Sequence, residues 1–148
     1  MGGDFPEAPA DTAPTFLAFA ARDSAPDATP LQQLQLIKGW IDADGKLYND
    51  VIQVAGTPNN GAGVDTSTGE RRGEGHDTLC SVYRDASFDP SQAAYYYLRV
   101  VENPTARWSL HDCLRIDEAD RPAVCSDGSY PSTIQEMAWT SPIWYRPN

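Results

Sequence analysis

Residues 93–102 constrain the fold most strongly, because three consecutive tyrosines are followed closely by two consecutive valines. The spacing of Ala94, Leu98 and Val101 would also permit a helix. Aromatic and β-branched side chains, however, pack best on a pleated surface. We therefore predict a strand, ended by Asn103–Pro104 because proline cannot continue a hydrogen-bonded ladder.

A β-hairpin is the next clearest element. Residues 36–41 and 47–55 both have strand composition, and Asp42-Ala43-Asp44-Gly45 between them is typical of a tight turn. Part of a calcium-binding loop also contains Asp-x-Asp-Gly, but the remaining ligand positions and the closing glutamate are missing here. We interpret this segment as a turn.

Three shorter segments also have strand character, which gives about six strands in all: 15–20, 79–83 and 141–146. Single helical turns are predicted at 31–34 and 132–136. Residues 56–77 and 109–131 are predicted to be long loops, in keeping with twelve Pro and eleven Gly. The predicted fold is mainly β, an antiparallel β-sandwich with long loops. It forms a single domain over 15–148, preceded by an irregular linker at 1–14.

The charge of the chain excludes several classes of partner. Its formal net charge is -10, and no Lys/Arg stripe is present. Phosphate backbones and anionic membrane surfaces would repel such a protein, so we expect no nucleic-acid partner. No apolar run approaches the roughly 20 residues that span a bilayer, so we expect no membrane insertion.

The three cysteines are Cys80, Cys113 and Cys125. Cys113 and Cys125 flank a polar stretch rich in Asp and Pro, where a disulfide would restrict the unfolded chain. Such a bridge would imply an oxidising compartment, so we expect a periplasmic or extracellular location. Two alternatives stay open: three buried thiols, or a thiolate-rich zinc site with His111. We expect no cofactor in this chain.

No complete catalytic signature is present. Ser109, His111 and Asp112 are triad residue types, but neighbours on an extended chain cannot easily converge. Arg107 beside Trp108 could stack, or bind a carboxylate or phosphate. The alternative is a buried Trp anchor with the arginine paired locally to Glu102.

Four motifs occur in one order along the chain and together resemble a known family. They are residues 1–5 (MGGDF), 35–40 (QLIKGW), 99–109 (RVVENPTARWS) and 138–145 (AWTSPIWY). They resemble the C-terminal part of a bacterial domain-of-unknown-function family, number 3604. The likeness covers nearly the whole chain, with 56–77 as its variable part.

The resemblance implies that a larger N-terminal domain precedes this chain in the parent protein. That domain is similar to the PHP (polymerase and histidinol phosphatase) metallohydrolases, which hold divalent metals through His and Asp. None of those ligands can be placed on this sequence. Some relatives carry a Cys where this chain has Ala106, which would leave one thiol without a partner and puts any carried-over disulfide pattern in doubt.

The function that follows is a non-catalytic accessory domain of a metal-dependent hydrolase, with the missing N-terminal domain as its partner. Glu102, Asn103, Arg107 and Trp108 are the candidates for the surface that meets it. A stand-alone β module that binds a ligand such as carbohydrate is the alternative, and it would require an exposed row of aromatic side chains. A small hydrolase in its own right is a third possibility, and it would require a pocket with convergent ionisable groups.

Overall fold

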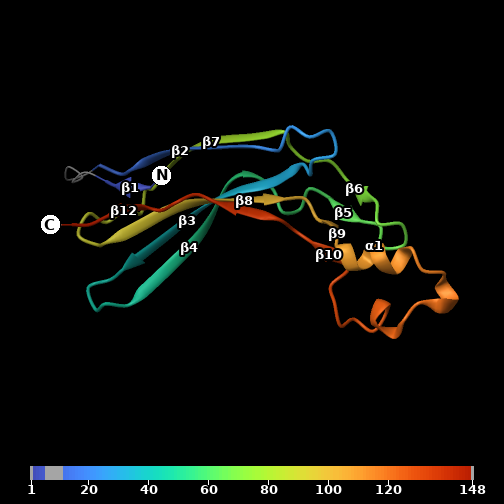
Figure 1. The fold of residues 1–148 in the computed structure, drawn as a ribbon. Helices are drawn as coiled ribbons and strands as arrows, with labels where there is room; N and C mark the ends of the chain where they lie inside the picture. The colour runs from blue at the N-terminus through green and yellow to red at the C-terminus, as the bar shows by residue number, and fades with distance from the viewer. Residues whose placement is uncertain (1, 6–11, 148) are drawn as a thin grey trace.

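A computed structural model describes residues 2–5 and 12–147 (Figure 1). Its largest element is a six-stranded sheet in the order β1-β12-β8-β3-β4, with β11 also pairing with β8. These strands are β1 (Gly3–Asp4), β3 (Leu31–Ile41), β4 (Leu47–Gly56), β8 (Ala94–Glu102), β11 (Met137–Trp139) and β12 (Ile143–Tyr145). All pairs are antiparallel except β1 with β12. The central strand, β8, is the segment that the sequence singled out.

A two-stranded ribbon forms a second layer over one face of this sheet (Figure 1). It consists of β2 (Thr15–Ala21) and β7 (Thr78–Arg84), paired antiparallel along their whole length. Side chains of β2 alternate strictly between buried and exposed, with Phe16, Ala18 and Ala20 turned inward. That alternation is the two-residue period of a strand packed on one side.

The core lies between the ribbon and the inner face of the sheet. One cluster gathers Phe16 with Leu36, Tyr96 and Tyr145, and a second gathers Ala18 and Ala20 with Leu31 and Leu34. The arrangement is mainly β and sandwich-like, as predicted. The predicted hairpin and the strands at β2, β7, β8 and β12 are also confirmed.

The structure corrects the prediction of a helical turn at 31–34. These residues begin β3, which is eleven residues long. Leu31 and Leu34 are buried in the core, and Gln32 and Gln33 between them are buried too. The amides of these two glutamines have partners inside the protein, so the strand continues through them.

The lead-in at 1–14 is not irregular throughout. Gly3 and Asp4 form β1, and the ring of Phe5 contacts the rings of Phe16 and Tyr96 edge to face. The prolines at 6 and 9 on which the prediction relied lie outside the described residues. The aromatic side chain of Phe5 therefore attaches residues 3–5 to the core.

Both long loops contain short elements. The first holds the small ribbon of β5 (Gly63–Val64) and β6 (Arg71–Arg72). The second holds α1 (Trp108–Leu114) and two 3-10 turns, η1 (Glu118–Asp120) and η2 (Ala123–Cys125). Instead of the helical turn predicted at 132–136, β10 (Thr133–Ile134) pairs with β9 (Thr105–Ala106). Of the helices that the structure describes, none is long and apolar enough to cross a membrane.

Candidate functional site

The outer face of the large sheet, turned away from the ribbon, carries a groove lined by aromatic side chains. Tyr96 points into the core, so its neighbours Tyr95 and Tyr97 point outward from β8. The groove has a volume of about 300 Å³. It is lined by Tyr95, Tyr97, Trp139, Thr140, Pro142 and Trp144. We call these six residues the aromatic groove.

The rings of the groove have a defined arrangement. Those of Tyr95 and Tyr97 are nearly parallel, with centroids 6.2 Å apart and planes inclined by 8°. Trp144 stands beside Tyr95 at 5.3 Å, tilted by 53°. Trp139 and Trp144 remain 59% and 41% exposed, so these indoles are not core anchors. The groove thus presents flat apolar surface to solvent.

Gly39 explains why Tyr95 can lie against the sheet. The two residues are paired across β3 and β8, and a Cβ built on Gly39 would collide with the far end of the Tyr95 ring. Without a side chain at 39, the ring can occupy the space over the glycine backbone. A large ring over a strand glycine also restores packing that the glycine lacks.

Polar side chains border the aromatic groove because strand register places them in the same rows. One row runs Asn49, Gly39, Tyr95, Trp144 from β4 to β12. Another runs Gln53, Gln35, Arg99, Trp139 from β4 to β11. In the second row, Arg99 Nε donates to Gln35 Oε1 at 2.7 Å, which fixes the guanidinium on this face. The face therefore combines flat rings with amide and guanidinium groups.

A buried ion pair lies on the opposite, inner face of the sheet. Lys38 Nζ is 2.6 Å from Asp85 Oδ2, and both side chains are almost completely buried. The hydroxyl of Tyr96 donates to the same oxygen at 2.7 Å. The other carboxylate oxygen accepts from the backbone N–H and the hydroxyl of Ser87 at 3.0 and 2.8 Å. Lys38 also donates to the carbonyl of Ser87 at 3.2 Å.

This network perturbs the titration of its members. Burial by itself raises the pKa of Asp85, but hydrogen bonds from Lys38, Tyr96 and Ser87 outweigh burial and leave the pKa below its ordinary value. Burial and the adjacent carboxylate raise the pKa of the Tyr96 phenol far above its usual range.

The geometry of the network indicates a structural role. Every group in it is engaged with another, and Asp85 is fully buried, so a substrate would meet no free acid or base here. The pair attaches the turn after β7 to the middle of the sheet. The sequence showed Asp85–Pro90 only as a turn, because nothing in a sequence identifies the partner of an isolated lysine.

The predicted interface residues fall into two environments. Asn103 is buried, where its side chain accepts from Asn60 Nδ2 at 2.8 Å and donates to the carbonyl of Glu74 at 3.2 Å. Glu102 is half-buried, and burial together with repulsion from Glu136 and Asp23 raises its pKa. Asn103 thus holds the loop 56–77 against the end of β8.

Arg107 and Trp108 instead begin the segment that projects beyond the end of the sheet (Figure 1). Trp108 is 68% exposed and lines an apolar pocket of about 290 Å³ with Tyr130 and the disulfide. Arg107 Nε is buried and makes no hydrogen bond to a described residue. Among the described residues no ion pair joins Arg107 to Glu102, so the structure does not support the local pairing considered as the alternative.

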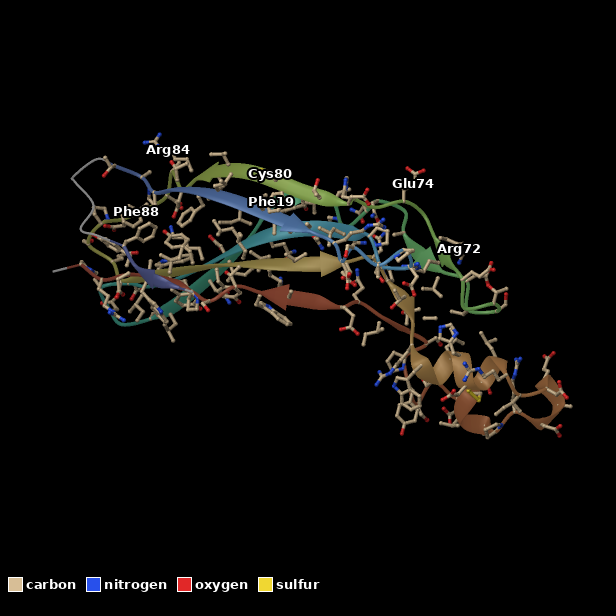
Figure 2. All side chains as sticks on the ribbon, turned by 45° about the horizontal axis from the view of Figure 1, so that its top comes forward. Phe19, Arg72, Glu74, Cys80, Arg84 and Phe88 are labelled. Atoms are coloured by element: carbon tan, nitrogen blue, oxygen red, sulfur yellow. A yellow bond between two sulfur atoms is a disulfide. The ribbon has the colours of Figure 1, made fainter. Side chains whose placement is uncertain are left out.

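The disulfide between Cys113 and Cys125 is present, as predicted from their flanking positions (Figure 2). It links α1 to η2 and leaves Cys80 as an exposed free thiol on β7. The bridge occupies two of the sulfurs that the zinc alternative required. Within residues 2–5 and 12–147, no three His, Cys, Asp or Glu side chains gather where they could hold a metal ion.

Comparison with known proteins gives one match. The sequence profile of a family described as protein of unknown function (DUF3604) matches residues 1–147. No curated protein and no solved structure matches the chain. This match covers almost the full length of the chain, so the chain belongs to the DUF3604 family.

Proposed function

We propose that this chain is a non-catalytic accessory domain of a larger metal-dependent hydrolase and that it docks on that protein through the outer face of the β2–β7 ribbon. One observation carries the proposal: the outer face of the ribbon is apolar and exposed. Leu17, Phe19 and Val82 are 72%, 60% and 68% exposed, and Cys80 lies among them. We call these four residues the ribbon face, where Figure 2 labels Phe19 and Cys80.

Register explains why these side chains form one patch. Leu17 is opposite Val82, and Phe19 is opposite Cys80, so all four share a face of the ribbon. The other face of the ribbon covers the core through Phe16, Ala18 and Leu79. Antiparallel strands with one solvated face normally alternate apolar and polar residues. Apolar residues on both faces are typical of strands that are covered on both sides, and exposed apolar patches mark interaction sites.

Two further observations support an accessory role. The buried titratable cluster of Lys38, Asp85 and Tyr96 is closed to substrate, because its groups are all engaged with one another. The disulfide fits an oxidising compartment, as the proposed periplasmic or extracellular location requires. In this proposal the metal, the substrate and the reaction belong to the N-terminal part of a longer protein.

The proposal is tested first by sequencing the DNA upstream of the Met1 codon. An open reading frame that encodes a His/Asp-rich domain behind a signal peptide is the expected result. A stop codon and a ribosome-binding site immediately upstream would overturn the accessory role.

A pair of variants then tests the ribbon face in that longer protein. Phe19→Ser should lower its thermal stability, because the substitution removes buried apolar area from the contact between domains. Val51→Ser is the matched control, since Val51 is also an exposed apolar strand residue but lies on β4. In the isolated 148-residue chain the two substitutions should have similarly small effects. Equal, small effects in the longer protein as well would contradict docking through the ribbon face.

The alternative is a stand-alone ligand-binding module. The aromatic groove is the observation that favours it, because an exposed row of aromatic rings is what such a module requires. A stand-alone module becomes the favoured function if no further domain is encoded upstream.

A further inference from the structure

We propose that the aromatic groove binds neutral carbohydrate chains. This inference goes beyond the accessory role and does not depend on it. The groove lies on the outer face of the large sheet, whereas the ribbon face lies on the other layer, so one molecule could use both surfaces at once (Figure 1).

The shape of the groove fits a sugar ring. One side of a pyranose is a nearly flat array of C–H groups, which packs against an aromatic ring with favourable dispersion and hydrophobic contact. Tyr95 and Tyr97 offer two nearly parallel rings 6.2 Å apart, and Trp144 and Trp139 add indole surface. Gly39 lets Tyr95 lie against the sheet, which pre-orders part of this surface before a ligand arrives.

The border of the groove fits the hydroxyl groups of a sugar. Arg99, Gln35 and Gln53 lie in one register row with Trp139, and Asn49 lies in the row of Tyr95. Amide side chains both donate and accept, and a guanidinium donates in a planar fork. Arg99 is next to Trp139, whereas the three amides lie further along the same face. These groups can therefore meet the hydroxyls of a chain of several sugar units whose first rings contact the aromatic side chains. A few placed polar groups around apolar walls is the usual composition of a small-molecule site.

Charge selects the class of ligand. None of the six groove residues is charged, and the two arginines beside them are already engaged, Arg99 with Gln35 and Arg146 with Asp4. Arg146 lies 6.0 Å from the Trp144 ring, and the chain as a whole carries a formal net charge of -10. Nucleic acids, which also stack on aromatic rings, would be repelled because such platforms need a basic groove to bind phosphates. The acyl chain of a lipid would leave the amide and guanidinium groups without hydrogen-bond partners. A neutral ring with apolar faces and polar edges fits both features.

The test is isothermal titration calorimetry of the 148-residue chain with cellohexaose, xylohexaose, mannohexaose and maltohexaose, with oligogalacturonate as the charged comparison. We expect at least one neutral hexasaccharide to bind and oligogalacturonate to bind more weakly. Tyr97→Ala and Trp139→Ala should each weaken that binding between about two-fold and ten-fold, the loss of one aromatic contact.

Trp108→Ala is the matched control and should leave the affinity unchanged, since Trp108 is comparably exposed but lines the pocket beside the disulfide. Circular dichroism confirms that each variant is folded before it is titrated. Flat traces with all four neutral sugars would overturn the inference. Binding that is lost in Trp108→Ala and kept in Trp139→Ala would overturn it as well. Neither outcome bears on docking through the ribbon face.

Discussion

The ring of Tyr95 lies over the backbone of Gly39, in the space that a side chain at position 39 would fill. This relationship links a strand that the sequence identified to a surface that it did not. Gly39→Ala should force the ring outward and lower the free energy of unfolding by about 1 kcal/mol, the lower end of overpacking costs, since the far end of a tyrosine can move.

The control for that variant is Gly63→Ala. Gly63 is also a strand glycine, but a Cβ there would meet no atom within 4 Å. Urea unfolding followed by tryptophan fluorescence compares the two. Equal stability of both variants, with unchanged near-ultraviolet circular dichroism, would contradict the prediction that the position of the Tyr95 ring requires a glycine at 39.

Substituting Lys38 should lower the free energy of unfolding by much more than the loss of one exposed charge would. Lys38→Met leaves the Asp85 carboxylate buried without its cation, which we expect to cost about 3–5 kcal/mol of unfolding free energy. Lys38→Met combined with Asp85→Asn should be more stable than the sum of the two single losses predicts, because no uncompensated charge remains. Strictly additive losses in urea titrations would contradict a coupled pair.

The ion pair of Lys38 and Asp85 should make the free energy of unfolding depend on pH in the acidic range. The pKa of Asp85 is lower in the folded protein than its ordinary value near 3.9, so its contribution is present above about pH 4. This contribution is lost as pH falls through the folded pKa. Exposed aspartates such as Asp65 also have lowered pKa values, so the comparison must be with Asp85→Asn. The stability gap between wild type and this variant should narrow below pH 4, and a constant gap would contradict the assignment.

The disulfide should hold the projecting segment together without supporting the sheet. Cys113 and Cys125 are twelve residues apart, so their bridge closes a small loop and contributes at most about 3 kcal/mol. In Cys113→Ser/Cys125→Ser, hydrogen exchange should accelerate over 108–132 and stay unchanged in β3 and β8. Cys80→Ser is the control and should change neither. Faster exchange in the strands would mean that the bridge supports the whole domain.

Local composition was sufficient to predict strands whose own residues strongly favour β structure. The tyrosine and valine run of β8 and the turn of the β3–β4 hairpin needed no knowledge of distant residues. The prediction was wrong at Leu31–Leu34, where the buried Gln32 finds its partner, Asn60, far away in the sequence. It was also wrong at Gly3–Asp4, because a two-residue strand exists only through its partner β12.

For the candidate sites too, the residue types could be predicted from the sequence, whereas their exposure and their neighbours could not. The four tryptophans could be named from the sequence, but the exposure of the three on strands depends on which face each strand turns to the ribbon, and that of Trp108 depends on where α1 lies. The alternation of side chains along a strand could have identified Tyr95 and Tyr97 as outward-facing. That inference requires knowing that Tyr96 points into the core, which the sequence does not show. Arg99 beside Trp139 follows only from the register of β8 with β11.

The central proposal is that the ribbon face docks on an N-terminal domain of a longer protein, and the reactivity of Cys80 is its most direct test. Cys80 is the exposed free thiol of that face and lies opposite Phe19. Its reaction rate with a maleimide is compared between the 148-residue chain and the longer protein. The control is a thiol introduced by Asp44→Cys at the hairpin turn in a Cys80→Ser background. We predict that Cys80 reacts readily in the isolated chain and at least ten-fold more slowly in the longer protein, an effect of about 1.4 kcal/mol or more, while the control thiol reacts equally in both. Equal reactivity of Cys80 in the two proteins would contradict the account.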